Sequence, residues 1–206
     1  MAFLDFDTTL FLWMTGGPNA AIWLVIIAIL IAKAPIYFLP LHMVNLWFSG
    51  SPKLKQTALA LFLALLIGTV LSYALGVVAY RPRPFVAGLG AALMDHRQSP
   101  SFPSNHALVF ATYATTLLLL RRRQLGLLVA SGGVVVGWSR IYLGVHYPLD
   151  IVGGAALGVV SSVASLWIMG RYGRTLYHHV DRVYIRTIDT MMTILSFGRD
   201  GSRGRR

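Results

Sequence analysis

The chain has 206 residues, of which 56% are hydrophobic and only 12% are charged, whereas about a quarter of the residues of an ordinary soluble domain carry a charge. This balance excludes intrinsic disorder and argues against a water-soluble globule. The chain contains no Cys, and its seven acidic residues are all Asp. Disulfides, Cys-based metal sites and paired-Glu mechanisms are therefore excluded.

The formal net charge of +11 fits either nucleic-acid binding or an anionic membrane face. Long uncharged stretches favour the membrane, so we predict no nucleic-acid partner. We expect an all-α polytopic membrane protein, a bundle of about five transmembrane helices with short interfacial helices. The expected spans are residues 20–41, 57–78, 104–120, 125–141 and 151–169.

The third and fourth spans are short, and each reaches a crossing length only if it includes polar residues at one end. Those polar ends are Ser104, Asn105 and His106 in the third span, and Ser139 and Arg140 in the fourth. We therefore expect these residues to lie near one membrane surface.

The segments at the two termini differ in composition from the spans. Residues 1–19 lack the basic start of a signal peptide and contain two Asp residues, which predicts a short segment lying on the outer interface. Residues 170–198 are Arg-rich with apolar residues at mostly helical spacing, which predicts an amphipathic cytoplasmic helix on the inner leaflet. We expect one membrane-embedded domain over residues 1–198 and disorder over residues 199–206.

The basic residues predict the orientation, because cytoplasmic loops collect Lys and Arg. Most of them fall on one side of the expected spans. They are Lys53, Lys55, Arg121, Arg122, Arg123 and the Arg residues of the tail. We expect this side and the C-terminus to be cytoplasmic, and the N-terminus and residues 80–103 to face outward across the plasma membrane.

The few polar residues of the outer side form three short motifs at span ends. The motifs are Arg83-Pro84, Pro103-Ser104-Asn105-His106, and Ser139-Arg140 followed by His146 and Asp150. Arg83 and Arg140 carry planar guanidinium groups that match phosphoryl oxygens and stay charged at neutral pH. Ser104 is a favoured N-cap, and the helix start behind it would offer free N–H groups to an anion. Ser104 and Asn105 can add side-chain donors, so the motifs predict a phosphate clamp.

Two histidines add reactive groups to this clamp. The Asp150 carboxylate can accept a hydrogen bond from one ring nitrogen of His146, which leaves a lone pair on the other. A histidine in this state can act as a nucleophile, so we predict a phosphohistidine intermediate. His106, in the first turn of the third span, is the candidate general acid, provided that it is protonated. The acidic residues are single rather than clustered, and we predict neither a metal site nor a cofactor.

Together the motifs resemble the three-part signature of the type 2 phosphatidic acid phosphatase superfamily, which contains membrane lipid phosphatases. The third motif, from Ser139 to Asp150, matches in full and is very specific. The resemblance implies a phosphatidic acid phosphatase/haloperoxidase-type helical bundle, metal independence and an active site at the outer membrane face. It implies His146 as nucleophile, with Asp150 as its partner, and His106 as general acid. The implied phosphate binders are Arg83, Ser104, Asn105 and Arg140.

Two positions depart from the family pattern. The first motif usually has a Lys seven residues before its Arg, whereas here Gly76 precedes Arg83 and Ala74 precedes Arg81. The second motif usually reads Pro-Ser-Gly-His, and this chain has Asn105 in place of the Gly. Both departures are similar to the bacterial undecaprenyl-diphosphate phosphatase branch, which is often linked to bacitracin resistance. That branch implies a polyprenyl diphosphate substrate, lipid-carrier recycling for cell-wall synthesis and a location in the bacterial inner membrane.

Several charged residues outside the motifs allow more than one interpretation. Arg81 either binds the second phosphate of a diphosphate, in place of the missing Lys, or anchors the chain at the interface. Lys33, inside the first span, is interpreted as structural. Asp95, His96 and Arg97 could form a lid or contact a headgroup, but a solvated turn is the simpler interpretation.

Other functions fit part of the same pattern. The alternatives are a phosphatase for phosphatidic acid or phosphatidylglycerophosphate, a lipid phosphotransferase, and a non-catalytic carrier of lipid phosphates. A vanadate-dependent peroxidase would share the phosphate clamp but is disfavoured by the membrane spans. The expected partners are therefore a lipid diphosphate substrate and the bilayer.

Overall fold

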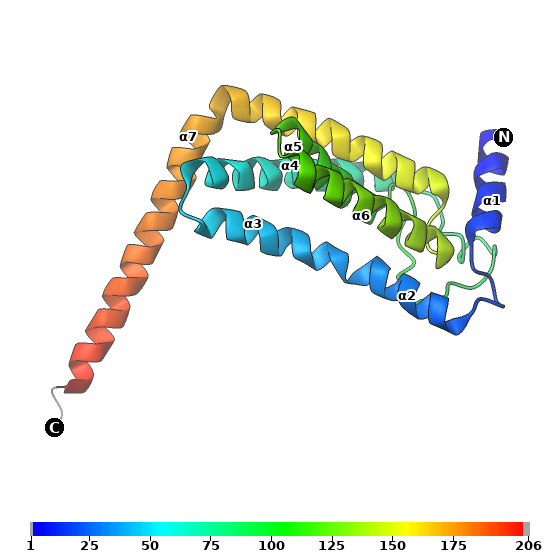
Figure 1. Cartoon of the computed structure of the whole chain (residues 1–206), viewed down its shortest axis with the longest axis horizontal. Helices are drawn as coiled ribbons and strands as arrows, with labels where there is room; N and C mark the ends of the chain where they lie inside the picture. The colour runs from blue at the N-terminus through cyan, green and yellow to red at the C-terminus, as the bar shows by residue number, and fades with distance from the viewer. Residues whose placement is uncertain (1, 204–206) are drawn as a thin grey trace. The chain divides into compact units, whose positions relative to one another are not determined.

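The computed structural model describes residues 2–203 of the chain and the side chains of residues 5–194, and its described elements are all helical (Figure 1). They are α1 (Ala2–Met14), α2 (Ile22–Lys33), the 3₁₀ helix η1 (Pro35–Tyr37), α3 (Phe38–Phe48), α4 (Pro52–Val78), α5 (Asn105–Leu119), α6 (Arg123–Tyr142) and α7 (Pro148–Arg203). The all-α fold class is confirmed.

Four helical stretches are long and apolar enough to cross a bilayer. They are Ile22–Phe48, which comprises α2, η1 and α3, then Pro52–Val78, Arg123–Tyr142 and Pro148–Ile194. The break between α2 and α3 lies at Pro35, whose ring removes a backbone donor. Pro40 lies in the first turn of α3, where a proline is tolerated.

The third expected span corresponds to α5, which is shorter than we expected. This helix has 15 residues and is therefore about 22 Å long at 1.5 Å per residue, less than the roughly 30 Å of a bilayer's hydrocarbon core. More than half of its residues are buried. The helix is short because Leu120 and Arg121 end it, with Arg121 at a positive φ of 61°.

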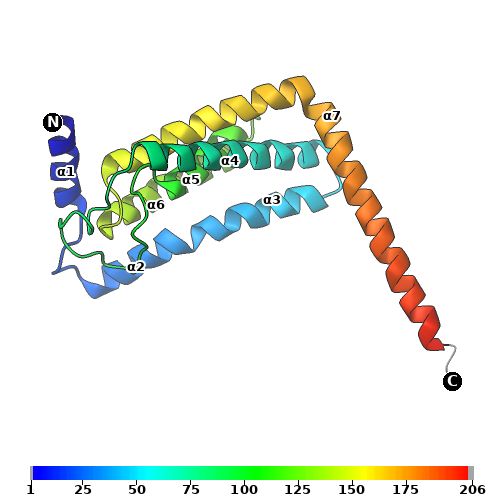
Figure 2. The ribbon, with the colours of Figure 1, turned by 180° about the vertical axis from the view of Figure 1, so that it is seen from behind.

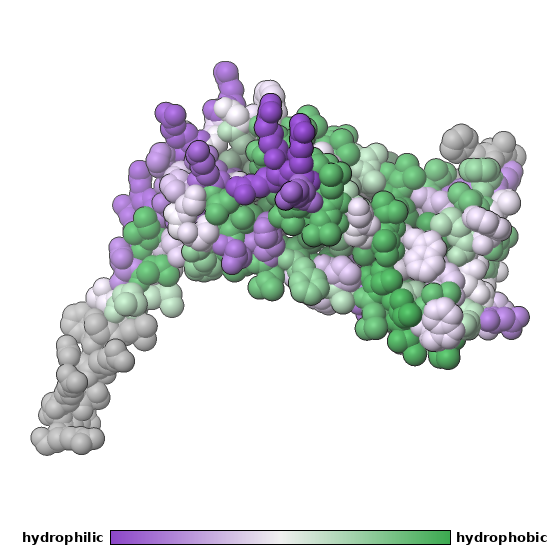
Figure 3. All heavy atoms as spheres, in the orientation of Figure 1, coloured by the Kyte–Doolittle hydropathy of each residue, from purple (hydrophilic) through white to green (hydrophobic). Residues whose placement is uncertain are grey.

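The core of the bundle lies around α5. Leu61 of α4 and Tyr113 and Leu117 of α5 are almost fully buried in one hydrophobic cluster. Figures 1 and 2 show α4, α5, α6 and the first part of α7 lying side by side. Large apolar side chains remain exposed on the outside, among them Phe62 and Val134, and Figure 3 shows an extensive hydrophobic surface. In a bilayer these side chains would contact lipid.

Helix α1 has one buried face and one exposed apolar face. Asp7 and Phe11 are 1% exposed, whereas Phe6 and Trp13 are 65% and 83% exposed. The Phe11 ring packs against the Tyr147 ring, with their centroids 5.4 Å apart. The predicted terminal segment is therefore a helix that packs on the bundle through one face.

The chain divides into two compact units, residues 1–167 and 168–206, and the division falls within α7. The first unit ends close to residue 170, where the predicted basic tail begins, and one membrane-embedded domain over residues 1–198 stays a prediction. The backbone of α7 is helical to Arg203, and the disorder that we expected over residues 199–206 stays a prediction. Residues 204–206 lie outside the described part of the chain.

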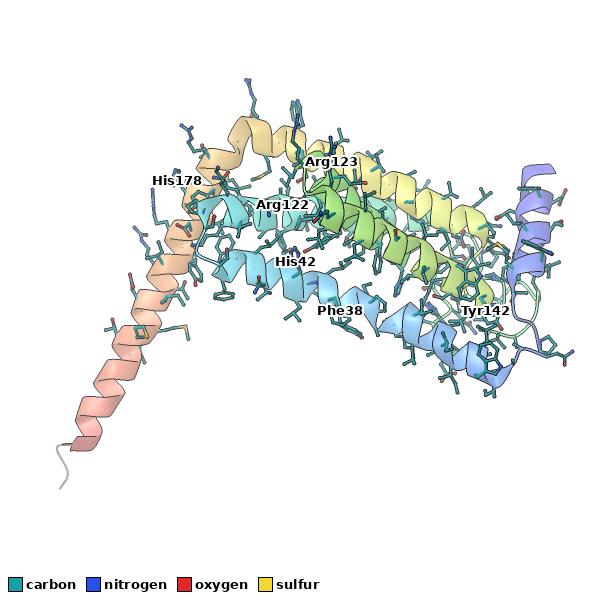
Figure 4. All side chains as sticks on the ribbon, viewed as in Figure 1. Phe38, His42, Arg122, Arg123, Tyr142 and His178 are labelled. Atoms are coloured by element: carbon teal, nitrogen blue, oxygen red, sulfur yellow. The ribbon has the colours of Figure 1, made fainter. Side chains whose placement is uncertain are left out.

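The two ends of the α5–α6 hairpin carry different groups. Arg122 and Arg123 lie at the start of α6, and Tyr142 lies at the other end of this helix (Figure 4). Arg140 is in the last turn of α6, and Asn105 begins α5. The three polar motifs and the Arg cluster therefore lie at opposite ends of the bundle.

Helix α7 approaches the start of α5 closely at Gly154. A Cβ added at Gly154 would overlap the carbonyl oxygen of Ser104, so we expect Gly154→Ala to destabilise the protein by about 1–3 kcal/mol. Gly170→Ala is the matched control in the same helix, because nothing lies within 4 Å of a Cβ added there. The measurement is thermal unfolding of the detergent-solubilised protein, and an unchanged melting temperature for Gly154→Ala would contradict the packing.

Candidate active site

Chain segments that are far apart in sequence meet at the end of the bundle that carries the three motifs. The backbone N–H of Ser104 donates to the carbonyl oxygen of Asp150 at 3.0 Å. The Ser72 hydroxyl of α4 donates to the side-chain oxygen of Asn105 at 2.7 Å. The start of α5 is thus held between α4 and the start of α7, as convergence of the motifs requires.

His146 and Asp150 form a buried pair at the start of α7. The two side chains are 3% and 0% exposed, and His146 Nδ1 lies 3.3 Å from Asp150 Oδ2. The same carboxylate oxygen accepts hydrogen bonds from the Tyr147 N–H at 2.8 Å and from the Ser101 hydroxyl. Since α7 begins at Pro148, His146 precedes the helix, and the carboxylate reaches back to it from the first turn.

Arg83 determines which ring nitrogen of His146 carries the proton. Its Nη1 lies 3.2 Å from His146 Nε2, and because a guanidinium only donates hydrogen bonds, Nε2 must be the acceptor. The proton is therefore on Nδ1 and faces Asp150. Burial, supported by the charges of Arg83 and Arg140 and opposed by Asp150, lowers the pKa of His146 to about 4. At neutral pH, Nε2 carries the lone pair that a nucleophile needs.

Arg83 is fixed in place by backbone carbonyl groups. Its Nε donates to the Ser99 carbonyl at 3.0 Å, and its Nη atoms donate to the carbonyls of Val145 and Pro100 at 2.8 and 3.2 Å. Burial lowers the pKa of Arg83 to about 10, which still leaves it charged at neutral pH. The loop that follows α4 thus holds a permanent cation beside the nucleophile.

Two buried donors at this end of the bundle have no hydrogen-bond partner among the described residues. They are Arg140 Nε and the Ser104 hydroxyl. Ser104 is at the N-cap position of α5, but its side chain makes no capping hydrogen bond. A buried donor without a partner costs about 1–3 kcal/mol, so both groups fit an acceptor supplied by a ligand. A phosphate oxygen has the charge and the acceptor capacity that they require.

His96 belongs to the site, although we interpreted residues 95–97 as a solvated turn. Its Nε2 accepts from Arg140 Nη2 at 2.6 Å, and its Nδ1 lies 3.1 Å from the Arg97 carbonyl oxygen. The His96 and His146 rings are edge to face with centroids 6.3 Å apart. Burial, with smaller effects from the nearby Arg charges, lowers the pKa of His96 to about 4. The interpretation as a solvated turn was wrong for His96, because the loop brings its ring onto Arg140, whereas Asp95 and Arg97 are exposed.

His106 and Asn105 lie at the same end of the bundle, in the first turn of α5. His106 is partly buried, is close enough to Arg140 for its charge to act on the ring, and its ring has no hydrogen-bond partner among the described residues. Asn105 is exposed, with its side-chain oxygen engaged by Ser72. The expected acid is thus beside the expected nucleophile.

Arg81 has different partners from the phosphate or interface that we expected. Its Nη1 lies 2.7 Å from Asp7 Oδ2 and 3.3 Å from Asp150 Oδ1. The guanidinium carbon is 3.6 Å from the centroid of the Tyr147 ring. Arg81 therefore supports the carboxylate behind His146, and its Nη1 is committed to two acids.

The described side chains also bear on metal binding. No group of three His, Asp or Glu side chains within residues 5–194 is arranged to hold a metal ion. The buried cationic side chains at this end of the bundle are Arg83 and Arg140.

Comparisons with known proteins show the family to which the chain belongs. The chain matches the PAP2 superfamily over residues 57–174. It is 34% identical to YbjG of Escherichia coli (strain K12) over 180 residues, which cover 87% of this chain and 91% of that protein. It is 30% identical to the undecaprenyl-diphosphatase BcrC of Bacillus subtilis (strain 168) over 134 residues, 65% of this chain and 69% of that protein. The crystal structure of the first transmembrane PAP2 type phosphatidylglycerolphosphate phosphatase from Bacillus subtilis has a TM-score of 0.63 and 26% sequence identity, covering 82% of this chain and 87% of that chain.

The protonation state of His146 can be measured directly. We expect its pKa to be about 4 in the folded protein, because burial disfavours the charged ring, so the resonance should not titrate between pH 5.5 and 8. NMR of ¹³C-labelled histidine, assigned by comparison with His146→Gln, would give the titration curve. The denatured protein serves as the control, with an ordinary midpoint near 6.5. A midpoint near 6.5 in the folded protein would contradict the assignment.

Proposed function

The chain belongs to the PAP2 superfamily and is a membrane lipid phosphatase, and from this premise we propose that it hydrolyses undecaprenyl diphosphate to undecaprenyl phosphate and inorganic phosphate. The observation that carries the proposal is the environment of His146. Its Nε2 lone pair faces a fixed guanidinium, while its Nδ1–H faces a buried carboxylate. The similarity to the undecaprenyl-diphosphatase BcrC supports this choice of lipid.

In the first step, His146 Nε2 attacks the terminal phosphorus of the diphosphate. An N–P bond forms, the bond to the bridging oxygen breaks, and the electron pair leaves with undecaprenyl phosphate. Arg83, Arg140, Ser104 and the Asn105 amide bind the equatorial oxygens and stabilise the charge of the transition state. Asp150 stabilises the positive charge that develops on the His146 ring.

His106 supplies the proton to the leaving oxygen. Burial is the main effect that lowers the pKa of His106, and the charges of Arg140 and Arg83 lower it further. A bound diphosphate would offset these charges and so favour the protonated ring. In the second step, water attacks the phosphohistidine and neutral His106 accepts its proton. The N–P bond breaks, its electrons return to His146, and inorganic phosphate leaves.

The setting of this reaction is also part of the proposal. We place the enzyme in the bacterial inner membrane with the site facing outward and the C-terminus in the cytoplasm. It would act without metal or cofactor in lipid-carrier recycling for cell-wall synthesis. The opposite placement of the motifs and of Arg121–Arg123 along the α5–α6 hairpin supports this orientation.

A second candidate function is hydrolysis of phosphatidylglycerophosphate or phosphatidic acid. The similarity to the Bacillus subtilis phosphatidylglycerolphosphate phosphatase structure favours it. Both functions use the same phosphate chemistry, so a comparison of lipids by kcat/KM separates them. Transfer of the phosphoryl group to another lipid would appear in the same assay as lipid loss without an equal release of phosphate.

We expect His146→Ala to reduce phosphate release from undecaprenyl diphosphate by at least about a thousandfold, because the variant lacks the nucleophile. The purified enzyme is assayed with EDTA present, and His179→Ala, which changes an exposed histidine of the tail, is the matched control. Acid-labile, base-stable label on the wild-type protein after rapid quenching with ³²P-substrate would identify the phosphohistidine. Activity retained by His146→Ala, or abolished by EDTA in the wild type, would contradict the proposal.

The orientation can be tested with single cysteines, because the chain has none. Gln98 and Gln124 are both exposed and lie at opposite ends of the bundle. In intact spheroplasts, a membrane-impermeant maleimide should label Gln98→Cys at once and Gln124→Cys only after permeabilisation. The reverse pattern would show that the site faces the cytoplasm.

A further inference from the structure

A chain of buried charges leads from α1 to the reactive histidine. Asp7 and Asp150 are 1% and 0% exposed, and Arg81 Nη1 lies between them, 2.7 Å from Asp7 Oδ2 and 3.3 Å from Asp150 Oδ1. Asp150 in turn accepts from His146. Asp7 thus connects to the reactive pair through one guanidinium, across more than 140 residues of sequence.

The second oxygen of Asp7 holds the beginning of α7. Asp7 Oδ1 accepts a hydrogen bond from the Leu149 N–H at 2.9 Å. The first turn of a helix has backbone N–H groups without partners inside the helix, and a carboxylate there is favourable. A residue of α1 therefore caps the turn from which Asp150 projects.

The two oxygens of Asp150 have separate tasks. Oδ2 accepts from His146, Ser101 and the Tyr147 N–H, and Oδ1 faces Arg81. Arg81 therefore limits rotation of the carboxylate about its χ2 bond, which keeps Oδ2 aimed at the His146 ring. Tyr147 supports Arg81, since the guanidinium carbon lies 3.6 Å from its ring centroid. The Phe11 ring of α1 packs against the same tyrosine ring.

We propose that Asp7 and Arg81 are positioning residues of the phosphatase reaction, and that α1 is in this way a part of the active site. The charges explain why both are needed. Asp7, Arg81 and Asp150 together present one net negative charge to His146, whose ring becomes positive as the N–P bond forms. Without Asp7, Arg81 would neutralise Asp150 and this stabilisation would be lost.

We expect Asp7 and Arg81 to affect the transition state rather than substrate binding. Asp7 and Arg81 Nη1 contact other protein groups, and not the side chains that would donate hydrogen bonds to the phosphate. This inference rests on the proposed function of His146 as nucleophile. We therefore expect Asp7→Asn, which keeps the size of the side chain, to lower kcat by roughly tenfold to a hundredfold, a loss typical for outer partners of a reactive group. KM should change less than about twofold.

The matched control is Asp5→Asn, which removes an exposed carboxylate from the same helix and should leave both constants unchanged. Rapid-quench measurements on ³²P-substrate separate positioning from folding. The amplitude of the phosphoenzyme reports the fraction of active sites, and its rate constant reports the chemical step. For Asp7→Asn we expect a retained amplitude with a rate constant lowered by the same factor as kcat, and partial recovery with Asp7→Glu.

The outcomes separate this inference from the function on which it rests. A wild-type enzyme that hydrolyses lipid without any phosphohistidine would overturn the proposed mechanism and this role with it. A wild-type phosphoenzyme that forms equally fast in Asp7→Asn would overturn the positioning role alone. A lower amplitude with an unchanged rate constant would show that Asp7 serves only folding, which also overturns the proposal.

Discussion

The buried carboxylate of Asp150 is the group on which the rest of the site depends. Removing an ion from water costs several kcal/mol even after relaxation, so the fold must supply donors to both oxygens. They come from Ser101, from the Tyr147 N–H, from His146 and from Arg81. These donors belong to the loop after α4 and to the turn before α7. Satisfying one carboxylate therefore draws separate segments to one end of the bundle.

The same end of the bundle carries an excess of positive charge where we expect the phosphate to bind, because two buried Arg side chains lie there. Arg83 and Arg140 are both buried, and the pKa of His96 and that of His146 are lowered, so these imidazoles add no charge at neutral pH. Neutral imidazole nitrogens accept from both guanidinium groups. An arriving phosphate oxygen would replace these weak acceptors by charged ones, and Arg140 Nε and the Ser104 hydroxyl would gain partners as well.

The sequence pattern predicted the helical class and the residues Arg83, Ser104, His106, Arg140, His146 and Asp150. The fold class is confirmed, and the structure brings these residues to one end of the bundle, because span ends alternate between two membrane sides and so place successive motifs on one surface. The chemical roles of the residues stay predictions. The contacts of His96 and Asp7 were not predicted. They form where the loop after α4 and helix α1 pack against the bundle, and the periodicity of a sequence does not predict such tertiary contacts. Arg81 was given a ligand role because its carboxylate partners are 74 and 69 residues away, beyond any local pattern.

The length of α5 relates these contacts to the membrane. In the orientation that we propose, Arg121–Arg123 lie at the inner headgroups, and a helix of about 22 Å would end several Å short of the outer edge of a roughly 30 Å hydrocarbon core. His106, in the first turn of α5, would then lie below the outer headgroups. The loop after α4 and α1 must fill the remaining depth, and these are the segments that supply His96 and Asp7 to the site. A recessed site needs such a cover, because charge stabilisation by Arg83 and Arg140 is strongest where water is excluded.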